Sequence, residues 1–232
     1  MFELLSWPTP NGLKVRLFLE ETGLPYRERP IDIGRGAQHA PEFLAVSPNH
    51  KIPVLIDHAP ADGGPALTVF ESGAILLYLA QRSGQLWPTA LRLQTEVMQW
   101  LCWQVAGLGP MAGQAGHFRV HAPEPVPYAI TRYTRETARL YGVLDRHLAT
   151  RTWIVGEQIS IADLACYPWI VPHAGLGQDL QAFPHLARWF AAIGARPATQ
   201  RSYAGVRDPY TGAPALSATE RAVLFGASSS PI

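Results

Sequence analysis

The sequence predicts an α/β domain followed by an all-α domain. Short strand and helix patterns alternate through about the first eighty residues, which is typical of an α/β layer domain. The rest lacks the period-two alternation of half-buried strands and carries long helical patterns. We place the first domain at residues 1–84 and the second at 91–225, with an expected disordered tail at 226–232.

The first half of the N-terminal domain reads as strand, helix, strand and short helix. Residues 2–6 form a short apolar strand, and a turn rich in proline and glycine follows it. Apolar positions at 13–21 recur at helical spacing, and Gly23 is placed to end that helix. We expect a second strand at 26–33 and a short helix at 41–46.

The second half of this domain reads as a hairpin and a helix. Residues 52–56 are apolar with Pro53 near the start, where a strand tolerates the missing N–H. A Gly-Gly turn follows, so residues 67–70 are expected to return as the second strand. Glu71-Ser72 then opens a strongly apolar helix at 73–81, which has to be buried nearly all round.

The C-terminal domain carries helical patterns at 91–105 and 128–148, separated by a Gly- and Pro-rich stretch at 107–127. Ser160 and Asp163 have the spacing of a capping box at a helix start. A second box at 217–220 predicts a brief helix that ends at Phe225.

Composition excludes several classes of function. The net charge of +1 lacks the basic excess of a general nucleic-acid binder, so no nucleic-acid partner is expected. Charged residues are 16% of the chain, below the usual ~25%, which favours a surface partly covered by a second copy. No apolar stretch approaches the ~20 residues that span a bilayer, so no membrane partner is expected.

Two cysteines, Cys102 and Cys166, cannot build a disulfide framework, and we expect both to be inert core residues. The histidines lack zinc-type spacing, so no metal is expected. The first residues lack the basic and long apolar regions of a signal peptide, which predicts a cytoplasmic protein.

Three motifs follow one another along the chain: Ile52-Pro53-Val54-Leu55, Phe70-Glu71-Ser72-Gly73-Ala74-Ile75 and Ser160-Ile161-Ala162-Asp163. In this order and spacing they resemble the cytosolic glutathione S-transferases, over about residues 1–200. The resemblance implies a thioredoxin-like N-terminal domain, an all-helical C-terminal domain, glutathione as cosubstrate and a homodimer.

The first turn, Thr9-Pro10-Asn11-Gly12, holds neither the tyrosine nor the cysteine that many of these enzymes carry there. Together with segments 49–53 and 103–111 it resembles the nu class, which is similar to the yeast nitrogen regulator of the same fold. The resemblance implies a disulfide reductase that uses the thiolate of bound glutathione. Conjugation of electrophilic substrates, or a non-catalytic glutathione-binding regulatory module, remain alternatives.

Glutathione brings its own thiol, of which only about 3% is thiolate at pH 7. Lowering the thiol pKa by about two units needs about 2.7 kcal/mol. Thr9 and Asn11 do not titrate, so as catalytic residues they can only donate hydrogen bonds to sulfur, helped by the positive end of a helix. Both are also favoured cap residues, a role compatible with contact to sulfur.

The resemblance assigns the rest of the site to glutathione binding. Ser72 and the helix start would hold the γ-glutamyl carboxylate and Glu71 its ammonium, although both residues also suit plain capping. If Pro53 is cis, the Ile52 backbone can pair with the extended tripeptide; otherwise Pro53 is an edge-strand proline.

Three further residues complete the expected glutathione site. Gln38 matches a contact to the glycyl end, or is a solvated loop residue. Arg132 matches a basic residue that lines the site, reaching across the dimer or staying within its own subunit, or is a surface charge. Lys51 could meet a carboxylate.

Overall fold

The computed structural model describes residues 1–207, 210 and 216–226, so most of the expected C-terminal tail lies outside the described residues. The N-terminal domain is built on a four-stranded mixed sheet with the order β2-β1-β3-β4. The central strand β1 (Phe2–Ser6) pairs parallel with β2 (Tyr26–Pro30) and antiparallel with β3 (Val54–Asp57). β4 (Leu67–Phe70) pairs antiparallel with β3, as the predicted hairpin requires.

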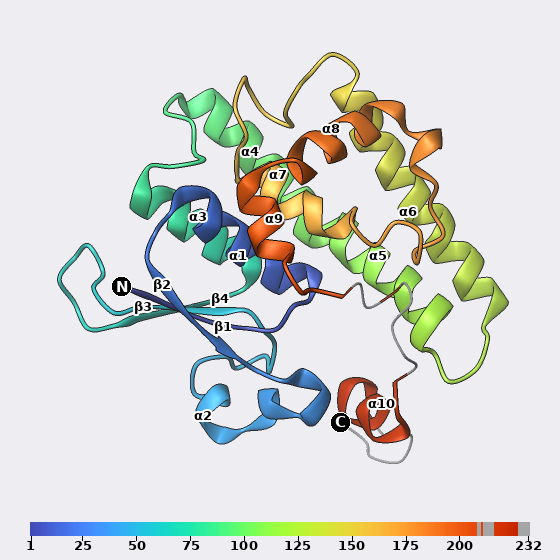
Figure 1. The fold of residues 1–232 in the computed structure, drawn as a ribbon, viewed down its shortest axis with the longest axis horizontal. Helices are drawn as coiled ribbons and strands as arrows, with labels where there is room; N and C mark the ends of the chain where they lie inside the picture. Colours follow the sequence, from blue (N-terminus) through green and yellow to red (C-terminus); the bar gives the residue numbers. More distant parts are fainter. Residues whose placement is uncertain (208–209, 211–215, 227–232) are drawn as a thin grey trace.

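Both faces of the sheet are covered by helices (Figure 1). α1 (Pro10–Thr22) and α3 (Ser72–Ser83) lie on one face, and α2 (Pro41–Leu44) lies on the other. Side chains along β1 alternate accordingly: Leu4 joins the core shared with α1 and α3, whereas Leu5 packs with Phe43 of α2. The sheet therefore forms the middle layer of the domain.

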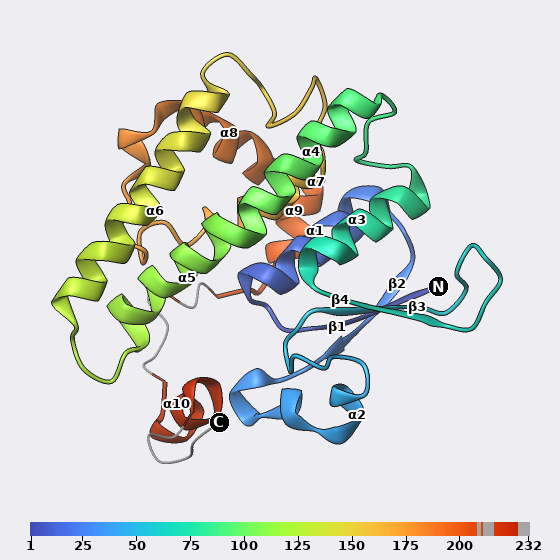
Figure 2. The ribbon, with the colours of Figure 1, turned by 180° about the vertical axis from the view of Figure 1, so that it is seen from behind.

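Seven helices of the described chain form the C-terminal domain. Their bounds are α4 (Leu91–Trp103), α5 (Gly109–Gly116), α6 (Pro127–Leu148), α7 (Ile161–Cys166), α8 (Pro184–Gly194), α9 (Pro197–Tyr203) and α10 (Ala218–Phe225). π-Helical turns at Gln104–Leu108 and His117–His121 join α4 to α5 and extend α5. Figure 2 shows the resulting long rod beside α6. Much of the Gly- and Pro-rich stretch is thus helical.

The two predicted capping boxes are present at the starts of α7 and α10. The Asp163 carboxylate is fully buried and accepts hydrogen bonds from the backbone N–H groups of Ser160 and Ile154. It also accepts a bond from the Trp189 indole at 2.8 Å. Asp163 therefore ties the start of α7 to the preceding loop and to α8.

The two domains share a continuous hydrophobic core. α1 packs against α3 of its own domain and against α7 and α9 of the helical domain. Polar contacts support this docking: Arg201 pairs with Glu20 at 2.7 Å, and Arg196 pairs with Glu21. Because α1 is held on both sides, its N-terminus occupies a fixed place between the domains.

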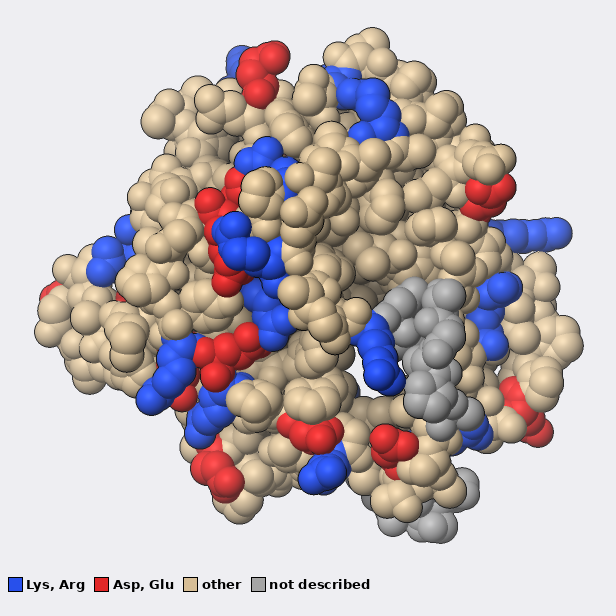
Figure 3. All heavy atoms as spheres, in the orientation of Figure 1, with Lys and Arg blue, Asp and Glu red and all other residues tan. Residues whose placement is uncertain are grey.

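On the face of the molecule drawn in Figure 3, neither acidic nor basic side chains gather into a large patch of their own. Figure 3 shows acidic and basic side chains interspersed, and a hollow opens between the helical domain and the lower part of the molecule. Within the described residues, no helix combines the length and apolar character needed to cross a bilayer.

Candidate functional site

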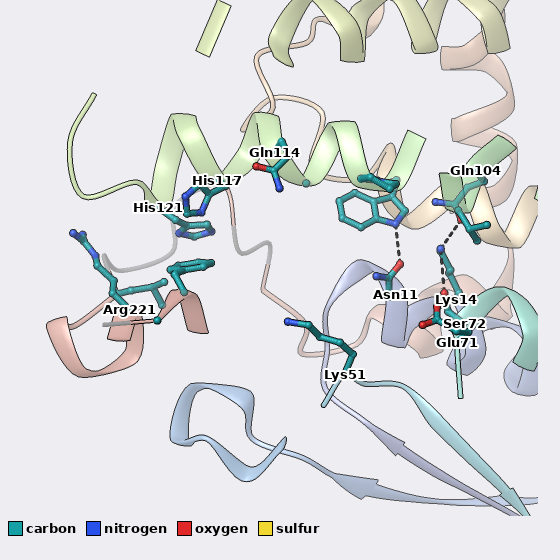
Figure 4. A pocket seen from close by; sticks show the side chains of 18 of the residues that line it. Asn11, Lys14, Lys51, Glu71, Ser72, Gln104, Gln114, His117, His121 and Arg221 are labelled. Carbon is teal, nitrogen blue, oxygen red and sulfur yellow. Dashed lines mark hydrogen bonds between the residues drawn. The ribbon is translucent and has the colours of Figure 1, made fainter. Parts of the chain in front are cut away.

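A cavity of ≈ 1320 Å³ lies between the two domains (Figure 4). Its inner end is built by the starts of α1 and α3 and by the turn after α4, and its outer end by the second π-helical turn and α10. The lining side chains labelled in the figure are Asn11, Lys14, Lys51, Glu71, Ser72, Gln104, Gln114, His117, His121 and Arg221.

The first turn of α1 presents a neutral donor to the cavity. Thr9 is the N-cap, and its hydroxyl oxygen accepts a bond from the Gly12 N–H at 3.4 Å. The Asn11 Oδ1 accepts a bond from the Trp169 indole N–H at 3.1 Å. With its oxygen held in this way, Asn11 turns its NH₂ group toward the cavity at the positive end of α1 (Figure 4). Thr9 caps the helix but does not line the cavity.

Gly12 allows α1 to start directly against the end of β1. A Cβ atom at this position would lie 2.2 Å from the Trp7 carbonyl oxygen and 2.4 Å from the Ser6 hydroxyl oxygen. Any side chain would therefore push the helix start away from the sheet. The glycine thus helps to set the position of Asn11.

Glu71 and Ser72 meet the cavity at the start of α3. Glu71 is the N-cap residue, with φ 72° and ψ 115°, a backbone conformation that costs about 1–3 kcal/mol for a non-glycine residue. Its carboxylate is exposed and makes no capping bond to the helix. Ser72 was one candidate for the cap itself, but the structure places it in the first helical turn. Its hydroxyl is therefore available to the cavity.

Two polar residues at the floor of the cavity were not predicted. Lys14 is 1% exposed, and its Nζ donates to Gln104 Oε1 at 2.5 Å and to Ser72 Oγ at 3.3 Å. Gln104 is 0% exposed and comes from the turn after α4. Burial lowers the pKa of Lys14 to about 7. One signal was available: Lys14 stands three residues after Asn11, so both lie on the same face of α1.

The loop before β3 adds a basic side chain to the cavity wall. The Ile52–Pro53 peptide bond is cis, and Lys51 lines the cavity beside it. Gln38 is buried at 6% exposure in a 3₁₀ turn, so it is not a solvated loop residue. It does not line the cavity, and its Nε2 lies 3.3 Å from a ring nitrogen of His39.

Arg132 lies apart from the other expected site residues. It projects from α6, is more than half exposed, and pairs with Glu136 at 3.7 Å. It does not line the cavity of its own chain. The structure of one chain therefore brings together Asn11, Lys51 and the start of α3, with Thr9 and Ile52 adjoining them, but not Arg132.

The outer end of the cavity is aromatic and basic. The Phe225 ring of α10 meets the rings of His117 and His121, with centroids 4.7 Å and 5.8 Å away. Burial lowers the pKa of His121, which keeps this imidazole neutral over more of the pH range. Arg221 adds a permanent positive charge to the same wall.

No cysteine is among the residues that line this cavity. Cys166 is buried, and burial raises the pKa of its thiol well above the usual range. Cys102 is exposed on α4, which corrects the expectation that it belongs to the core. Among the described residues, no group of three or more His, Cys, Asp or Glu could hold a metal ion.

Comparison with known families agrees with this architecture. The model of the glutathione S-transferase N-terminal domain matches residues 1–81, and that of the C-terminal domain matches residues 111–197. The chain belongs to the glutathione S-transferase family. The predicted thioredoxin-like and all-helical arrangement is confirmed.

Among the relatives of this glutathione S-transferase is the disulfide-bond oxidoreductase YfcG of Escherichia coli K12. It is 51% identical over 199 residues, which are 86% of this chain and 93% of YfcG. A glutathione transferase family member from Pseudomonas fluorescens, solved with two glutathione molecules bound, has a TM-score of 0.82 and 43% identity, covering 87% of this chain and 91% of its own.

The nitrogen regulation fragment of the yeast prion protein Ure2p has a TM-score of 0.81 and 37% identity, covering 88% of this chain and 96% of its own. The resemblance to the yeast regulator is thereby confirmed. In this glutathione S-transferase α10 lies beyond the residues that the family models match, whereas Asn11, Lys14 and Ser72 lie within them.

Proposed function

We propose that this glutathione S-transferase is a glutathione-dependent disulfide reductase of the nu-class type, in which the thiolate of bound glutathione is the nucleophile. The main observation is the Asn11 amide, held by Trp169 at the positive end of α1 and facing a cavity with no lining cysteine. The reactive sulfur then has to arrive with a ligand. The name of YfcG, at 51% identity, supports disulfide chemistry.

Binding of glutathione follows from the same geometry. The γ-glutamyl carboxylate would meet the Ser72 hydroxyl and the start of α3, and its ammonium would meet the exposed Glu71 carboxylate. The Ile52 backbone beside the cis bond would pair with the extended peptide. Lys51 would meet a carboxylate, and Gln38, which does not line the cavity of the free protein, is proposed to contact the glycyl end.

Neutral groups can supply the free energy that is needed to lower the pKa of the glutathione thiol. A hydrogen bond to a charged partner contributes about 1.5–3 kcal/mol, and a helix terminus adds about 0.3–2 kcal/mol. Together these supply the ~2.7 kcal/mol that lowers a thiol pKa by about two units. Asn11 at the start of α1 would therefore suffice without a general base, and Thr9, the N-cap beside it, is proposed as the second catalytic residue although it does not line the cavity of the free protein.

The reaction balances with two glutathione molecules. The first thiolate attacks a disulfide sulfur, so one S–S bond forms as the other breaks, and the released thiolate takes a proton. A second glutathione thiolate attacks the mixed disulfide and releases the other substrate thiol. Two glutathiones are oxidised to glutathione disulfide and one substrate disulfide is reduced to two thiols.

We further infer a homodimer that works in the reducing cytoplasm. Apolar side chains of Leu67, Phe70 and Val105 are exposed in the single chain, and the chain is poor in charge. A second copy that covers these apolar side chains would also allow Arg132 to line the glutathione site of the partner subunit. This arrangement would explain why Arg132 lies outside the cavity of its own chain.

Relative rates on two substrates test the reaction type. The purified protein is assayed with glutathione and either hydroxyethyl disulfide or 1-chloro-2,4-dinitrobenzene. We expect the disulfide to be the better substrate, and a clear preference for the chlorinated aromatic would favour a conjugating transferase. Glutathione binding in a calorimeter without turnover of either substrate would instead favour the non-catalytic regulatory module.

A further inference from the structure

Lysine is rare in this chain, and both lysines line the cavity. Of 19 basic residues only Lys14 and Lys51 are lysine, and the other 17 are arginine. Lys14 is also among the largest fully buried side chains. A buried ammonium is costly unless its partners compensate for the lost water. The burial of the Lys14 ammonium therefore needs a functional explanation.

The Lys14 ammonium is held from two sides by neutral oxygens. It donates to Gln104 Oε1 of the helical domain and to Ser72 Oγ at the start of α3. Because the Ser72 oxygen accepts from Lys14, its own hydrogen points elsewhere, and Ser72 lines the cavity. Lys14 thus leaves Ser72 as a hydrogen-bond donor toward a ligand and places a positive charge behind it.

The charged groups around Lys14 are few. Glu71 at the start of α3 is the carboxylate that supports its charge. Cys166 on α7 also faces it, but burial raises the pKa of that thiol and keeps it neutral. Tyr167, in the turn after α7, and Tyr203 of α9 also belong to elements that pack against α1, and both stay neutral because burial raises their pKa as well.

We propose that Lys14 is a positioning residue that makes the start of α3 select a carboxylate rather than a neutral amide. The chemical class recognised is an α-amino acid end whose carboxylate accepts from Ser72 and whose ammonium meets Glu71. The inference rests on the proposed function, because it takes that end to be the γ-glutamyl group of glutathione.

Lysine suits this role better than arginine would. Its compact ammonium fits between Ser72 and Gln104, and unlike a guanidinium it can lose its proton when it is buried. Burial lowers its pKa to about 7 in the free protein. A bound carboxylate raises that pKa, so binding above neutral pH takes up a proton, and affinity falls as the pH rises.

Calorimetry with S-methylglutathione tests this role, because the methylated sulfur cannot release a proton of its own. For the wild type we expect affinity to fall about fivefold between pH 6 and pH 8, with proton uptake detected in buffers of different ionisation enthalpy. Lys14→Met should bind about tenfold more weakly at pH 6 and lose the uptake. The histidines remain in this variant, so their titration is controlled.

Two comparisons sharpen the result. Lys51→Met removes the other cavity lysine and should retain the proton uptake. An S-methylglutathione analogue with the γ-glutamyl carboxylate converted to an amide should bind the wild type about tenfold more weakly, and Lys14→Met should lose most of this discrimination. Wild-type affinity in Lys14→Met, or an unchanged pH profile, would overturn the role of Lys14.

A measurement on the unmodified chain avoids dependence on the variant's folding. With [ε-¹³C]lysine the wild type shows two lysine signals, assigned with Lys51→Arg. The Lys14 signal should titrate between pH 6 and pH 8 in the free protein and stay that of the charged form when S-methylglutathione saturates the site. Titration above about pH 9.5 would refute the inference. Failure of the wild type to bind at all would refute the proposed function instead.

Discussion

The Asn11 side chain is held through its oxygen and is available to a ligand through its NH₂ group. Trp169 holds its oxygen, so its NH₂ group has one orientation toward the cavity. A donor that is already oriented loses little side-chain entropy when an anion arrives. The proposed stabilisation of sulfur therefore depends on a contact between residues 158 positions apart.

Replacing Asn11 by Ala should lower disulfide turnover about 10- to 100-fold, because a hydrogen bond to a developing thiolate is lost. Glutathione affinity should change less, since most binding groups remain. Steady-state rates and calorimetry on the same preparation separate the two effects. Unchanged turnover would contradict the role of Asn11.

The double variant Cys102→Ser, Cys166→Ser should retain disulfide reductase activity, because neither sulfur lines the cavity. Circular dichroism establishes that the variant is folded, since Cys166 is fully buried. Activity lost from a folded variant would show that the protein supplies a thiol after all.

Among single residues, Asn11 and Ser72 could be recognised as site residues from the sequence only because they lie in family motifs. Lys14 lies in none of these motifs, and a lysine two positions before Arg16 in a helical pattern is ordinarily a solvated side chain. Its burial arises from packing against a distant helix start and Gln104. No local pattern encodes such a contact.

The helix that runs from α4 into α5 shows tertiary context overriding propensity. In the sequence a Gly- and Pro-rich stretch at 107–127 separates two helical patterns, yet the chain continues as helix into this stretch through a π-helical turn. Leu108 and Ala112 are fully buried against the core, which outweighs the weak helix propensity. A Cβ at Gly109 would also lie 2.8 Å from Gln104 Nε2, so the glycine makes room for the floor of the cavity.

We expect α10, which lines the outer end of the cavity away from the proposed glutathione-binding groups, to contact the disulfide substrate more than glutathione. It packs against the 3₁₀ turn at 33–35 and places Phe225 against the two imidazoles of the outer wall. Phe225→Ala should raise the KM for the disulfide about two- to tenfold and leave glutathione affinity nearly unchanged. Leu224→Ala is the matched control on the same helix, because Leu224 does not line the cavity.

The predicted capping boxes show what local sequence can establish. Both Ser160 and Ser217 start helices where the spacing indicated, since the cap and its partner lie within one turn. The sequence of α9 carries no such signal, and no side chain caps the start of this helix. Its position depends on packing against α1.

The whole molecule depends on the docking of its two domains through α1. The Arg201 hydrogen bond lowers the pKa of Glu20, so the pair stabilises the folded state above the unfolded pKa of about 4.3 and loses this effect as the pH falls. Glu20→Gln should cost at most about 1 kcal/mol of unfolding free energy at pH 7.

Urea unfolding at several pH values checks this contribution. The difference between Glu20→Gln and the wild type should shrink below about pH 4 and in high salt. An equal difference at pH 3.5 and pH 7 would mean that the pair does not act through its charge.

The order of the two domains was predictable from the sequence, because periodicity changes sharply near residue 84. The floor of the cavity was not, since it joins the first helix to residues of the second domain. Gln104 lies 90 positions from Lys14, and such a separation carries no local signature.

The concentration of both lysines in the cavity affects how the protein can be handled. Amine-reactive dyes, cross-linkers and sensor surfaces normally attach at random to many exposed lysines. Here the accessible side-chain amine is Lys51, which is exposed at the cavity wall. Immobilisation through lysine would therefore block ligand entry.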